Sequence, residues 1–348
     1  MVLTELDAKI RDYCSESLMS CALRVTHKDQ ILMDTSYGFA DHEKQLPFTK
    51  DSMFTFYSLS KPFCALGILQ LVDRGLVDLD SHPGKYLPEA AAFDSRVTIR
   101  HLLQHTSGVP DFAPSAGYIQ PYAPGYADKA REHLKFVADF PSFFAPGTDA
   151  RYSNIGYFVS ALIMENISGL SYPEYMRKFV FDPLGMKTAL VDNETLQIPN
   201  RVQGYHALDE AETQIAPCEK SHDWMLGGGD LVGTVDDVYA LNHAVKHRLL
   251  LKPETWEQVL TPSPLNNKGF GCTITQWHGK TRVTHNGGHR GFRTYHVHLQ
   301  EDDFDIIILS NCGFHNTGRS DISEMIYNAF FDESATAEKP LEMDTGYI

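Results

Sequence analysis

Ser58 and Lys61 are separated by two residues, a spacing that places both side chains on one face of a helix. An amine within hydrogen-bond reach of a serine hydroxyl can take up the hydroxyl proton and so activate a weak nucleophile. Burial lowers the pKa of an amine towards the working range and favours this role. The pair therefore predicts a serine nucleophile with a lysine as proton acceptor. Ser60 is a poorer candidate because it points to another side of the helix.

Two further motifs could bring supporting groups to this serine. Tyr152-Ser153-Asn154 stands just ahead of an apolar run, and His285-Asn286-Gly287-Gly288 follows much later in the chain. Each motif alone is weak, because a chain with this many serines and lysines would contain one Ser-x-x-Lys by chance. Their order and their flanking residues favour one active site, in which a serine is served by a lysine and a tyrosine.

The composition indicates a folded protein and argues against several partners. Hydrophobic residues make up 43% and charged residues 22% of the 348 residues, close to globular averages, and a chain of this length usually forms two lobes. The net charge of −15 opposes binding to phosphate backbones or anionic lipid. We therefore expect neither nucleic acid nor a membrane as partner, and the oligomeric state is left open.

The amino terminus and the cysteines bear on the compartment. Residues 1–11 alternate charged and apolar side chains, and no uncharged apolar stretch reaches the ~20 residues of a membrane span. The chain as given predicts a cytoplasmic protein, although removal of a leader would leave a similar pattern. The six cysteines lack metal-type spacing, so we expect them to be reduced and mostly buried.

Hydrophobic spacing predicts the elements around the serine. An amphipathic helix is expected over 4–18 and a hairpin over 21–37. A mostly buried helix is expected over 58–74 and should begin at the serine, because Pro62 is tolerated in a first helical turn. Ser58 would then lie at the positive end of a helix dipole, which favours negative charge near its oxygen.

The middle of the chain has a mainly helical pattern with long loops. Helices are expected over 97–105, entered through Thr98, over 155–167, and over 232–245, with a capped start at residues 234–237. The stretch 108–125 is rich in proline and aromatic residues. It is either a stiff wall of a substrate cleft or an ordinary surface loop packed on its own side chains.

The last third changes from a period of 3.6 to a period of 2. Strands are expected over 270–276, 282–285, 294–300 and 304–310, followed by a helix over 321–331. In 294–300 apolar residues alternate with histidines, as expected of a strand with one covered face. The run Ile306 to Leu309 is apolar on both faces and predicts an inner strand.

Longer stretches around these motifs resemble the serine β-lactamase and penicillin-binding-protein superfamily, in its class C-like branch with D-aminopeptidases and family VIII carboxylesterases. The stretches are 56–62 (FYSLSKP), 98–108 (TIRHLLQHTSG), 146–147 (PG) ahead of 152–157 (YSNIGY), and 227–234 (GGGDLVGT). The resemblance extends over residues 15 to 330. It implies an α+β fold of the β-lactamase/transpeptidase type, with an antiparallel sheet flanked by terminal helices and an inserted mainly helical domain.

On this chain the resemblance implies a discontinuous sheet domain over 1–75 and 230–335, a helical domain over 76–229 and a tail over 336–348. It implies an enzyme without cofactor or metal. Its partner would be a small-molecule or short-peptide substrate.

The resemblance also implies catalytic roles. Ser58 would be the nucleophile that forms an acyl-enzyme, Lys61 would hold or take its proton, and Tyr152 would serve as general base and acid. Asn154 would hydrogen-bond the substrate amide or the lysine. The oxyanion would be held by the backbone N–H groups of Ser58 and Gly288.

The third motif departs from the β-lactamase pattern. β-Lactamases usually carry Lys-Thr/Ser-Gly there, whereas this chain carries His285-Asn286-Gly287. We expect these three residues to belong to the substrate-binding site. A permanent cation for a β-lactam or terminal carboxylate is therefore missing, and His285 can supply one only when protonated. Arg290 or Arg293 are possible substitutes. We expect inefficient β-lactam hydrolysis.

Several functions remain open at this point. A cytoplasmic member would cleave small amides, D-amino-acid peptides or esters, and the alternatives are β-lactamase or DD-carboxypeptidase activity and a non-catalytic ligand sensor. A metal hydrolase could use His101 and His105, but the glutamate of His-Glu-x-x-His is absent and no third ligand is evident. We expect these two histidines to be structural and to support the loop that follows.

Overall fold

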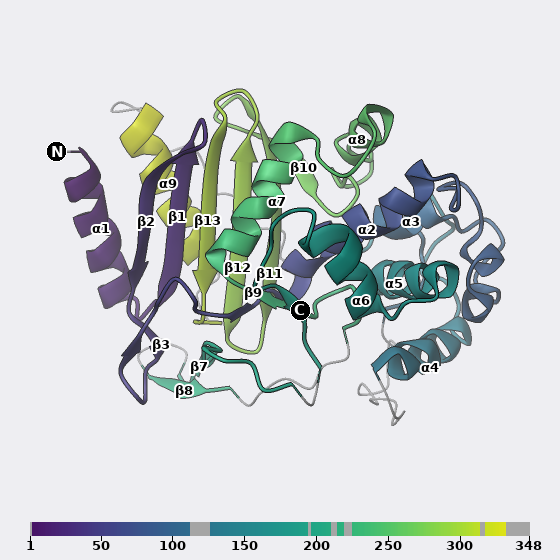
Figure 1. The fold of residues 1–348 in the computed structure, drawn as a ribbon, viewed down its shortest axis with the longest axis horizontal. Helices are drawn as coiled ribbons and strands as arrows, with labels where there is room; N and C mark the ends of the chain where they lie inside the picture. The colour runs from purple at the N-terminus through teal and green to yellow at the C-terminus, as the bar shows by residue number, and fades with distance from the viewer. Residues whose placement is uncertain are drawn as a thin grey trace.

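A computed structural model describes residues 2–111, 126–193, 196–209, 214–218, 225–313 and 317–331. Its centre is an antiparallel six-stranded sheet built from both ends of the chain (Figure 1). The strands, in spatial order, are β10 (Thr273–Trp277), β11 (Lys280–His289), β12 (Phe292–Leu299), β13 (Phe304–Ser310), β1 (Cys21–His27) and β2 (Gln30–Tyr37). The antiparallel sheet expected from the family resemblance is thus present.

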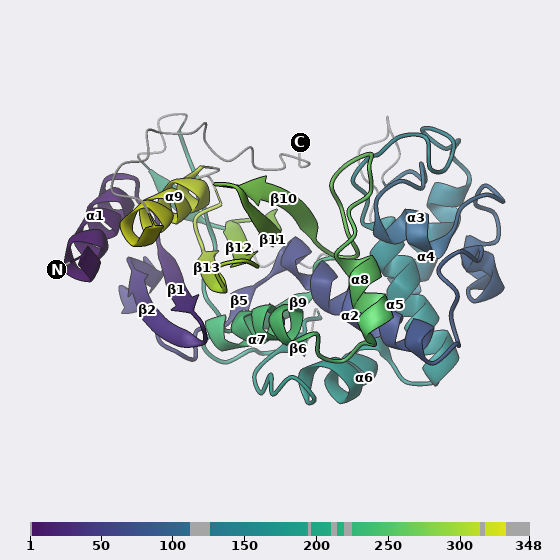
Figure 2. The same cartoon turned by 90° about the horizontal axis from the view of Figure 1, so that it is seen from above.

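Helices cover both faces of this sheet. Figure 2 shows α1 (Val2–Glu16) and α9 (Gly318–Phe331) on one face and α7 (Val235–His247) on the other. Successive apolar residues of β13 point to opposite faces of the sheet. Ile306 and Ile308 pack with α1 and α9, whereas Ile307 and Leu309 belong to the larger hydrophobic core on the other face. The prediction of an inner strand here is confirmed, because β13 lies between β12 and β1.

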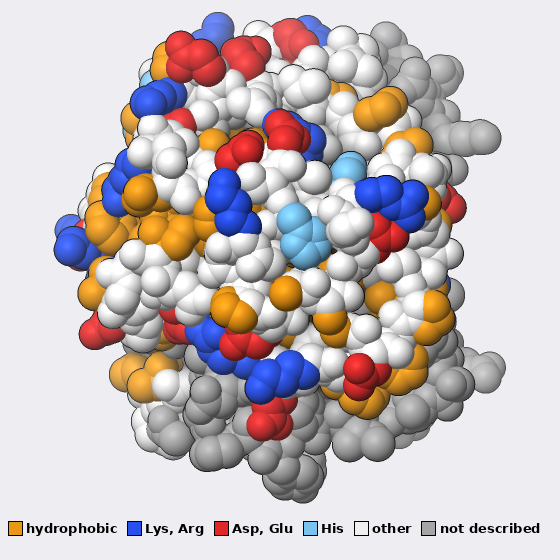
Figure 3. All heavy atoms as spheres, turned by 90° about the vertical axis from the view of Figure 1, so that its right-hand side faces the viewer, with side chains coloured by type: hydrophobic (Ala, Val, Ile, Leu, Met, Phe, Trp, Pro, Cys, Tyr) orange, Lys and Arg blue, Asp and Glu red, His pale blue; other side chains and the backbone are white. Residues whose placement is uncertain are grey.

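The remaining helices gather at one end of the sheet (Figure 1). They are α2 (Lys61–Asp73), α3 (Ile99–Leu103), α4 (Tyr126–Ala138), α5 (Ile155–Ser168), α6 (Tyr172–Met176) and α8 (Pro253–Val259). The buried helix α2 packs against the equally apolar α5. Acidic, basic and apolar side chains are mixed on the surface at this end (Figure 3). The division into two domains at residues 76 and 229 stays a prediction.

Short strands form three smaller sheets outside the central one. They are β3 (Phe39–Asp41) with β4 (Leu46–Pro47), β7 (Tyr205–Ala207) with β8 (Ile215–Pro217), and a three-stranded sheet of β5 (Phe54–Thr55), β9 (Leu231–Gly233) and β6 (Leu190–Val191). β5 leads directly to the serine motif, and β9 follows the glycine stretch 227–229. This small sheet therefore holds two motifs side by side that are distant in the sequence.

Most of these elements were predicted from the sequence. The first helix, the hairpin, the helix entered through Thr98, the capped start of α7 at Thr234 and the closing helix are confirmed. All six cysteines are free, and Cys218 is half-buried while the others are buried, as expected. Most of the loop 108–125 and the tail after residue 331 lie outside the described residues.

The serine helix begins later than expected. Residues Tyr57–Ser60 form a 3₁₀ turn, η1, and the α-helix α2 starts only at Lys61. Pro62 lies in the first turn of α2, as its missing amide hydrogen requires. Tyr57 has a left-handed φ of 48°, which is uncommon for a residue with a side chain. Ser58 therefore stands on a tight, bent entry to the helix.

The expectation that strand 294–300 has only one covered face is wrong. His296 and His298, on the face expected to be open, are 1% and 4% exposed. Helix α7 covers them, and Asn242 on α7 accepts a 2.6 Å hydrogen bond from Nδ1 of His296. Asn242 also donates to the carbonyl of Val297 at 3.1 Å. Alternation of histidine with apolar residues resembles a solvent-facing pattern, but a hydrogen-bonded histidine can be buried.

Replacing Asn242 by Ala should weaken the packing of α7 on the sheet. The change leaves the buried imidazole N–H of His296 without its acceptor, which typically costs about 1–3 kcal/mol. We expect the free energy of unfolding in urea to fall by about this amount. Gln276→Ala, at an exposed position of β10, is the control and should change stability by less than about 0.5 kcal/mol. Equal stabilities of the two variants would contradict this account.

Candidate active site

Ser58, Lys61 and Tyr152 meet as the sequence predicted. Nζ of Lys61 donates to Oγ of Ser58 at 2.9 Å. The hydroxyl of Tyr152 lies 2.7 Å from the same oxygen. One alcohol oxygen thus has an amine and a phenol as immediate neighbours, although Tyr152 is distant in the sequence. This is the arrangement required of a nucleophile with adjacent proton acceptors.

Lys61 is completely buried and its partners are neutral. Besides Ser58, its ammonium contacts Oδ1 of Asn154 at 2.8 Å and the carbonyl of Gly228 at 2.6 Å. Burial lowers the pKa of Lys61 to about 7, because a charged amine loses its hydration there. A substantial fraction of the amine is therefore uncharged near neutral pH and able to accept a proton.

The glycine stretch 227–229 supplies one of these acceptors. Gly227 has a left-handed φ of 70°, and a Cβ there would crowd the carbonyl of Tyr157 and the thiol of Cys64. The carboxylate of Asp230 accepts the N–H of Gly227 at 2.8 Å and braces the turn. Burial raises the pKa of Asp230 to about 7. The turn places the carbonyl of Gly228 directly on Lys61.

Tyr152 is held between a cation and a neutral ring. Nζ of Lys61 lies 4.9 Å from the centre of the Tyr152 ring, a distance at which a cation is attracted to the aromatic face. His105 stacks on the same tyrosine with ring centres 4.5 Å apart. Burial holds the pKa of His105 well below its usual value, and its Nδ1 accepts the N–H of Ser153 at 3.2 Å. His105 is structural as expected, but it supports the tyrosine motif.

Asp111 is a site residue that the sequence analysis missed. Its carboxylate accepts three hydrogen bonds from the Tyr-Ser-Asn motif and one from the residue after it: the N–H of Asn154 (2.7 Å), Nδ2 of Asn154 (2.8 Å), Oγ of Ser153 (3.1 Å) and the N–H of Ile155 (3.1 Å). The amide of Asn154 is thereby oriented with Nδ2 towards Asp111 and Oδ1 towards Lys61. No motif marked Asp111, because its role depends on a contact distant in sequence.

The third motif lies on β11 against the serine turn. Any side chain at Gly287 would collide with the carbonyl of Phe56 and the hydroxyl of Thr294, so only glycine permits this approach. Thr294 also donates to the carbonyl of Phe56 at 2.8 Å and fixes the start of η1. Asn286 and Gly288 are half-buried on the same strand. The structure thus brings all three motifs together.

His285 is buried and uncharged. Its Nδ1 donates to the carbonyl of Asn286 at 2.7 Å, and burial holds the pKa of the ring well below its usual value. His285 therefore does not provide a cation near neutral pH. The guanidinium of Arg293 lies beside Gly288, where a Cβ would stand 3.0 Å from Nη1, whereas Arg290 is exposed. Arg293 is the better placed of the two arginines considered as substitutes.

Arg319 is a second residue missed at the sequence level. It is buried under β11 and β12, and Nη1 donates to the carbonyls of Thr294 at 2.9 Å and Gly287 at 3.3 Å. The carbonyl of Gly287 belongs to the same peptide group as the N–H of Gly288. A cation on that carbonyl polarises the peptide group and strengthens its N–H as a donor. The sequence showed only that an arginine stands close to the expected closing helix, and no motif marked it as part of the site.

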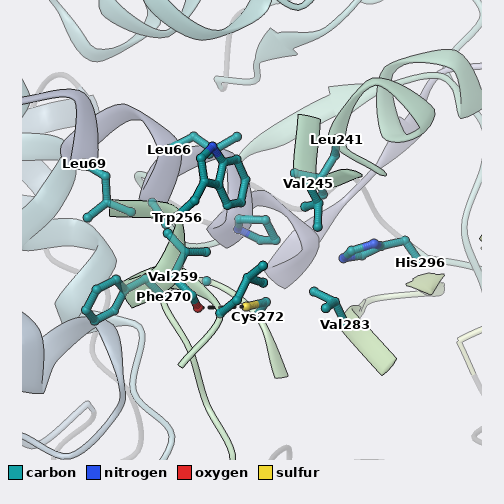
Figure 4. Close-up of a pocket in the computed structure, with 14 residues that line it drawn as sticks. Leu66, Leu69, Leu241, Val245, Trp256, Val259, Phe270, Cys272, Val283 and His296 are labelled. Atoms are coloured by element: carbon teal, nitrogen blue, oxygen red, sulfur yellow. Dashed lines mark hydrogen bonds between the residues drawn. The ribbon is translucent and has the colours of Figure 1, made fainter. Parts of the chain in front are cut away.

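A small cavity lies beside the serine helix, separate from the reacting groups. Figure 4 shows it between α2, α7, α8, residues 270–272 and the strands β11 and β12, with Leu66, Trp256 and Val283 around it and His296 at one side. Its volume of about 20 Å³ fits a water molecule and is too small for a substrate. Ser58, Lys61 and Tyr152 do not line it, and we assign it no catalytic role.

The two histidines considered for a metal hydrolase do not converge. His101 lies in α3, where its Nδ1 accepts the N–H of Thr98 and completes a capping box. His105 follows after the helix has ended, with its ring on Tyr152. Neither belongs to a group of metal-ligating side chains in the described part of the chain.

Comparison with known proteins agrees with this geometry. Residues 6–325 match the family described as Beta-lactamase. The chain belongs to the beta-lactamase family. The resemblance stated from the motifs is therefore confirmed.

Curated relatives and solved structures share the family fold. Penicillin-binding protein 4* from Bacillus subtilis (strain 168) is 31% identical over 304 residues, which cover 81% of this chain and 65% of that protein. D-aminopeptidase from Gluconobacter oxydans (strain 621H) is 25% identical over 308 residues, covering 83% and 55%. This chain thus spans less than two thirds of either relative.

Among solved structures, D-amino acid amidase from Ochrobactrum anthropi SV3 in complex with D-phenylalanine superposes with a TM-score of 0.78. It is 23% identical, and the match covers 94% of this chain and 97% of that one. The expected β-lactamase/transpeptidase fold is confirmed. None of the described helices is both long and apolar enough to cross a bilayer.

Replacing Lys61 by Met should show how much the buried amine lowers the free energy of unfolding. The pKa is about 7 in the folded protein and about 10.4 in an unfolded chain, so the unfolded state binds more protons between these values. Wild-type stability therefore rises with pH across this window, and Lys61→Met removes this dependence. We expect the variant to be more stable near neutral pH, with an advantage that shrinks by up to about 1.4 kcal/mol per pH unit.

Urea unfolding at several pH values from neutral to about 10 measures this difference. Lys9→Met, at an exposed position of α1, is the matched control and should keep the wild-type pH dependence. An advantage of Lys61→Met that does not vary with pH would show that Lys61 is not depressed in pKa.

Proposed function

We propose that this protein is a serine hydrolase that forms an acyl-enzyme on Ser58 and cleaves small amide, D-amino-acid peptide or ester substrates. The observation that supports this most is the position of Oγ of Ser58, 2.9 Å from the amine of Lys61 and 2.7 Å from the hydroxyl of Tyr152. A serine held only for structure would not need two proton-transfer groups on one oxygen.

The proposed reaction proceeds in two steps. Oγ of Ser58 attacks the substrate carbonyl carbon while its proton passes to the uncharged amine of Lys61 or to Tyr152 in its phenolate form, and a tetrahedral oxyanion forms. The carbon–nitrogen or carbon–oxygen bond then breaks, and the same proton passes to the leaving amine or alcohol. Water then attacks the ester on Ser58 and gives up a proton to the amine or the phenolate. That proton passes to Oγ of Ser58 as its bond to the acyl carbon breaks, so that the acid is released and the serine hydroxyl is restored.

The oxyanion would lie between the backbone N–H groups of Ser58 and Gly288. Loss of one such donor typically costs about 10² to 10³ in rate, so the approach of β11 to η1 matters directly. The absence of a side chain at Gly287 permits this approach. Arg319 would act through the carbonyl of Gly287 as a positioning residue.

The site is better suited to an uncharged or amine-bearing substrate than to a β-lactam. The neutral, buried His285 leaves the third motif without its usual cation. The names of the relatives, which include a D-aminopeptidase and a D-amino acid amidase, point the same way. The net charge of −15 disfavours nucleic acid and anionic lipid as partners. A cytoplasmic location, a two-domain division and hydrolysis without a cofactor or catalytic metal are part of this proposal.

Substitution of Ser58 tests the nucleophile. Ser58→Ala should reduce release of nitrophenol from a short-chain nitrophenyl ester to background, and Lys61→Ala and Tyr152→Phe should each lose most turnover in a folded protein. Ser60→Ala is the matched control: its Oγ accepts the N–H of Leu231 at 3.0 Å, so it should lower stability by about 1 kcal/mol and retain turnover.

Two results would contradict parts of this proposal. Wild-type turnover no higher than that of Ser58→Ala would favour a non-catalytic ligand sensor. Near-native turnover in folded Lys61→Ala or Tyr152→Phe would show that the proton acceptor is misassigned.

Substrate preference separates the remaining activities. Anilides of D-amino acids should be hydrolysed faster than those of the L-enantiomers, and a chromogenic cephalosporin should be a poor substrate because His285 carries no charge. Comparison of kcat/KM for these substrates and the ester makes the measurement. A kcat/KM highest for the cephalosporin would favour β-lactamase or DD-carboxypeptidase activity instead.

A further inference from the structure

A group of metal-ligating side chains lies outside the serine site, between α7 and the turn of the β1–β2 hairpin. It consists of Asp29 on the turn and His243 and His247 on α7. One ligand atom of each residue lies within 4.8 Å of the other two. The two segments are distant in the sequence, so folding alone brings these three donors together.

The two histidines stand one helical turn apart on the same face of α7. Their ring centres are 4.2 Å apart, and Nε2 of His247 lies 3.8 Å from a carboxylate oxygen of Asp29. Metal–nitrogen and metal–oxygen distances of about 2.0–2.2 Å require the donors to approach by only about 1 Å. Asp29 and His247 are exposed and His243 is half-buried, so the side chains can make this movement and an ion can reach them.

A lysine and a second carboxylate lie beside Asp29. Nζ of Lys246 contacts Oδ2 of Asp29 at 2.6 Å and Asp303 at 2.7 Å. Among the described residues, Oδ1 of Asp29 accepts a long hydrogen bond of 3.4 Å from the hydroxyl of Tyr239. Two carboxylates and one ammonium leave the group with a net negative charge when both histidines are neutral.

We propose that Asp29, His243 and His247 bind a divalent transition-metal ion of the zinc class, with water completing the coordination. Two imidazoles and one carboxylate match zinc, whereas magnesium and calcium prefer oxygen ligands only. The ion would fasten α7 to the hairpin turn, at a site whose ligands make no contact with Ser58, Lys61 or Tyr152. Its effect is on stability, and hydrolysis does not require it.

A neighbouring group is less suitable for a metal. His298, Asp303 and Asp305 also lie close together. Nδ1 of His298, however, is already bonded to Asp305 at 2.9 Å, and Asp305 accepts the hydroxyl of Thr26 at 2.8 Å. His298 and Asp305 are buried, so an ion would have to break an internal network to enter. The exposed group on α7 carries the proposal.

Titration of the full, chelator-treated chain with zinc tests this site. Isothermal calorimetry should show binding, and the midpoint of thermal unfolding should rise with zinc concentration and stay constant with magnesium. His243→Ala, His247→Ala and Asp29→Asn should each weaken zinc binding at least ~10-fold, the smallest effect usual for loss of a supporting partner. Ester turnover of these variants should equal that of the wild type.

Two further variants sharpen the test. Lys246→Met removes the ammonium that competes for Asp29 and should therefore tighten zinc binding. His206→Gln is the matched control, since the exposed His206 contacts the half-buried Cys218 at 3.4 Å and forms another pair that zinc could use. No binding by the wild type at about 1 mM zinc, or wild-type affinity in the Asp29 and His247 variants together with loss in His206→Gln, would overturn the proposal.

Discussion

The buried amine of Lys61 is the constraint on which the rest of the site depends. A charged amine without water is costly, so the group persists only because three acceptors surround it: Ser58, Asn154 and Gly228. These acceptors come from three segments that are far apart in the chain. Any change that separates the segments leaves the amine without partners, and chemical competence and correct folding are therefore coupled at this residue.

Asp111 and Arg319 are joined to the site through neutral groups. Asp111 is hydrogen-bonded to the amide of Asn154, which contacts Lys61, and Arg319 donates to the carbonyl of Gly287 beside the serine turn. Burial lowers the pKa of Lys61 to about 7, and the more distant charges of Asp111 and Asp230 offset part of this lowering. The groups in direct contact with the amine are neutral. A carboxylate in direct contact would raise that pKa further and remove the proton acceptor.

Sequence reasoning reached the groups that touch the serine but not the groups that hold them. Ser58, Lys61 and Tyr152 lie in motifs with fixed local spacing, and periodicity located the strands that carry the third motif. Asp111 and Arg319 act through contacts made only after folding, and no local pattern marks them. The buried face of β12 was missed for a related reason: hydropathy treats His296 as polar, whereas burial depends on the acceptor that Asn242 provides.

The entry to the serine helix shows why the sheet must be complete before the site can exist. The left-handed φ of 48° at Tyr57 is unfavourable and is retained only where neighbouring contacts enforce it. The ring of Tyr57 packs edge-on against His289 at 5.2 Å and near Phe292 at 6.0 Å. His289 lies on β11, the strand that carries the third motif, and Phe292 lies on its neighbour β12. Strands from the last third of the chain therefore hold the bend that aims Ser58 at Lys61. The geometry of the serine motif therefore depends on its contacts with β11 and β12.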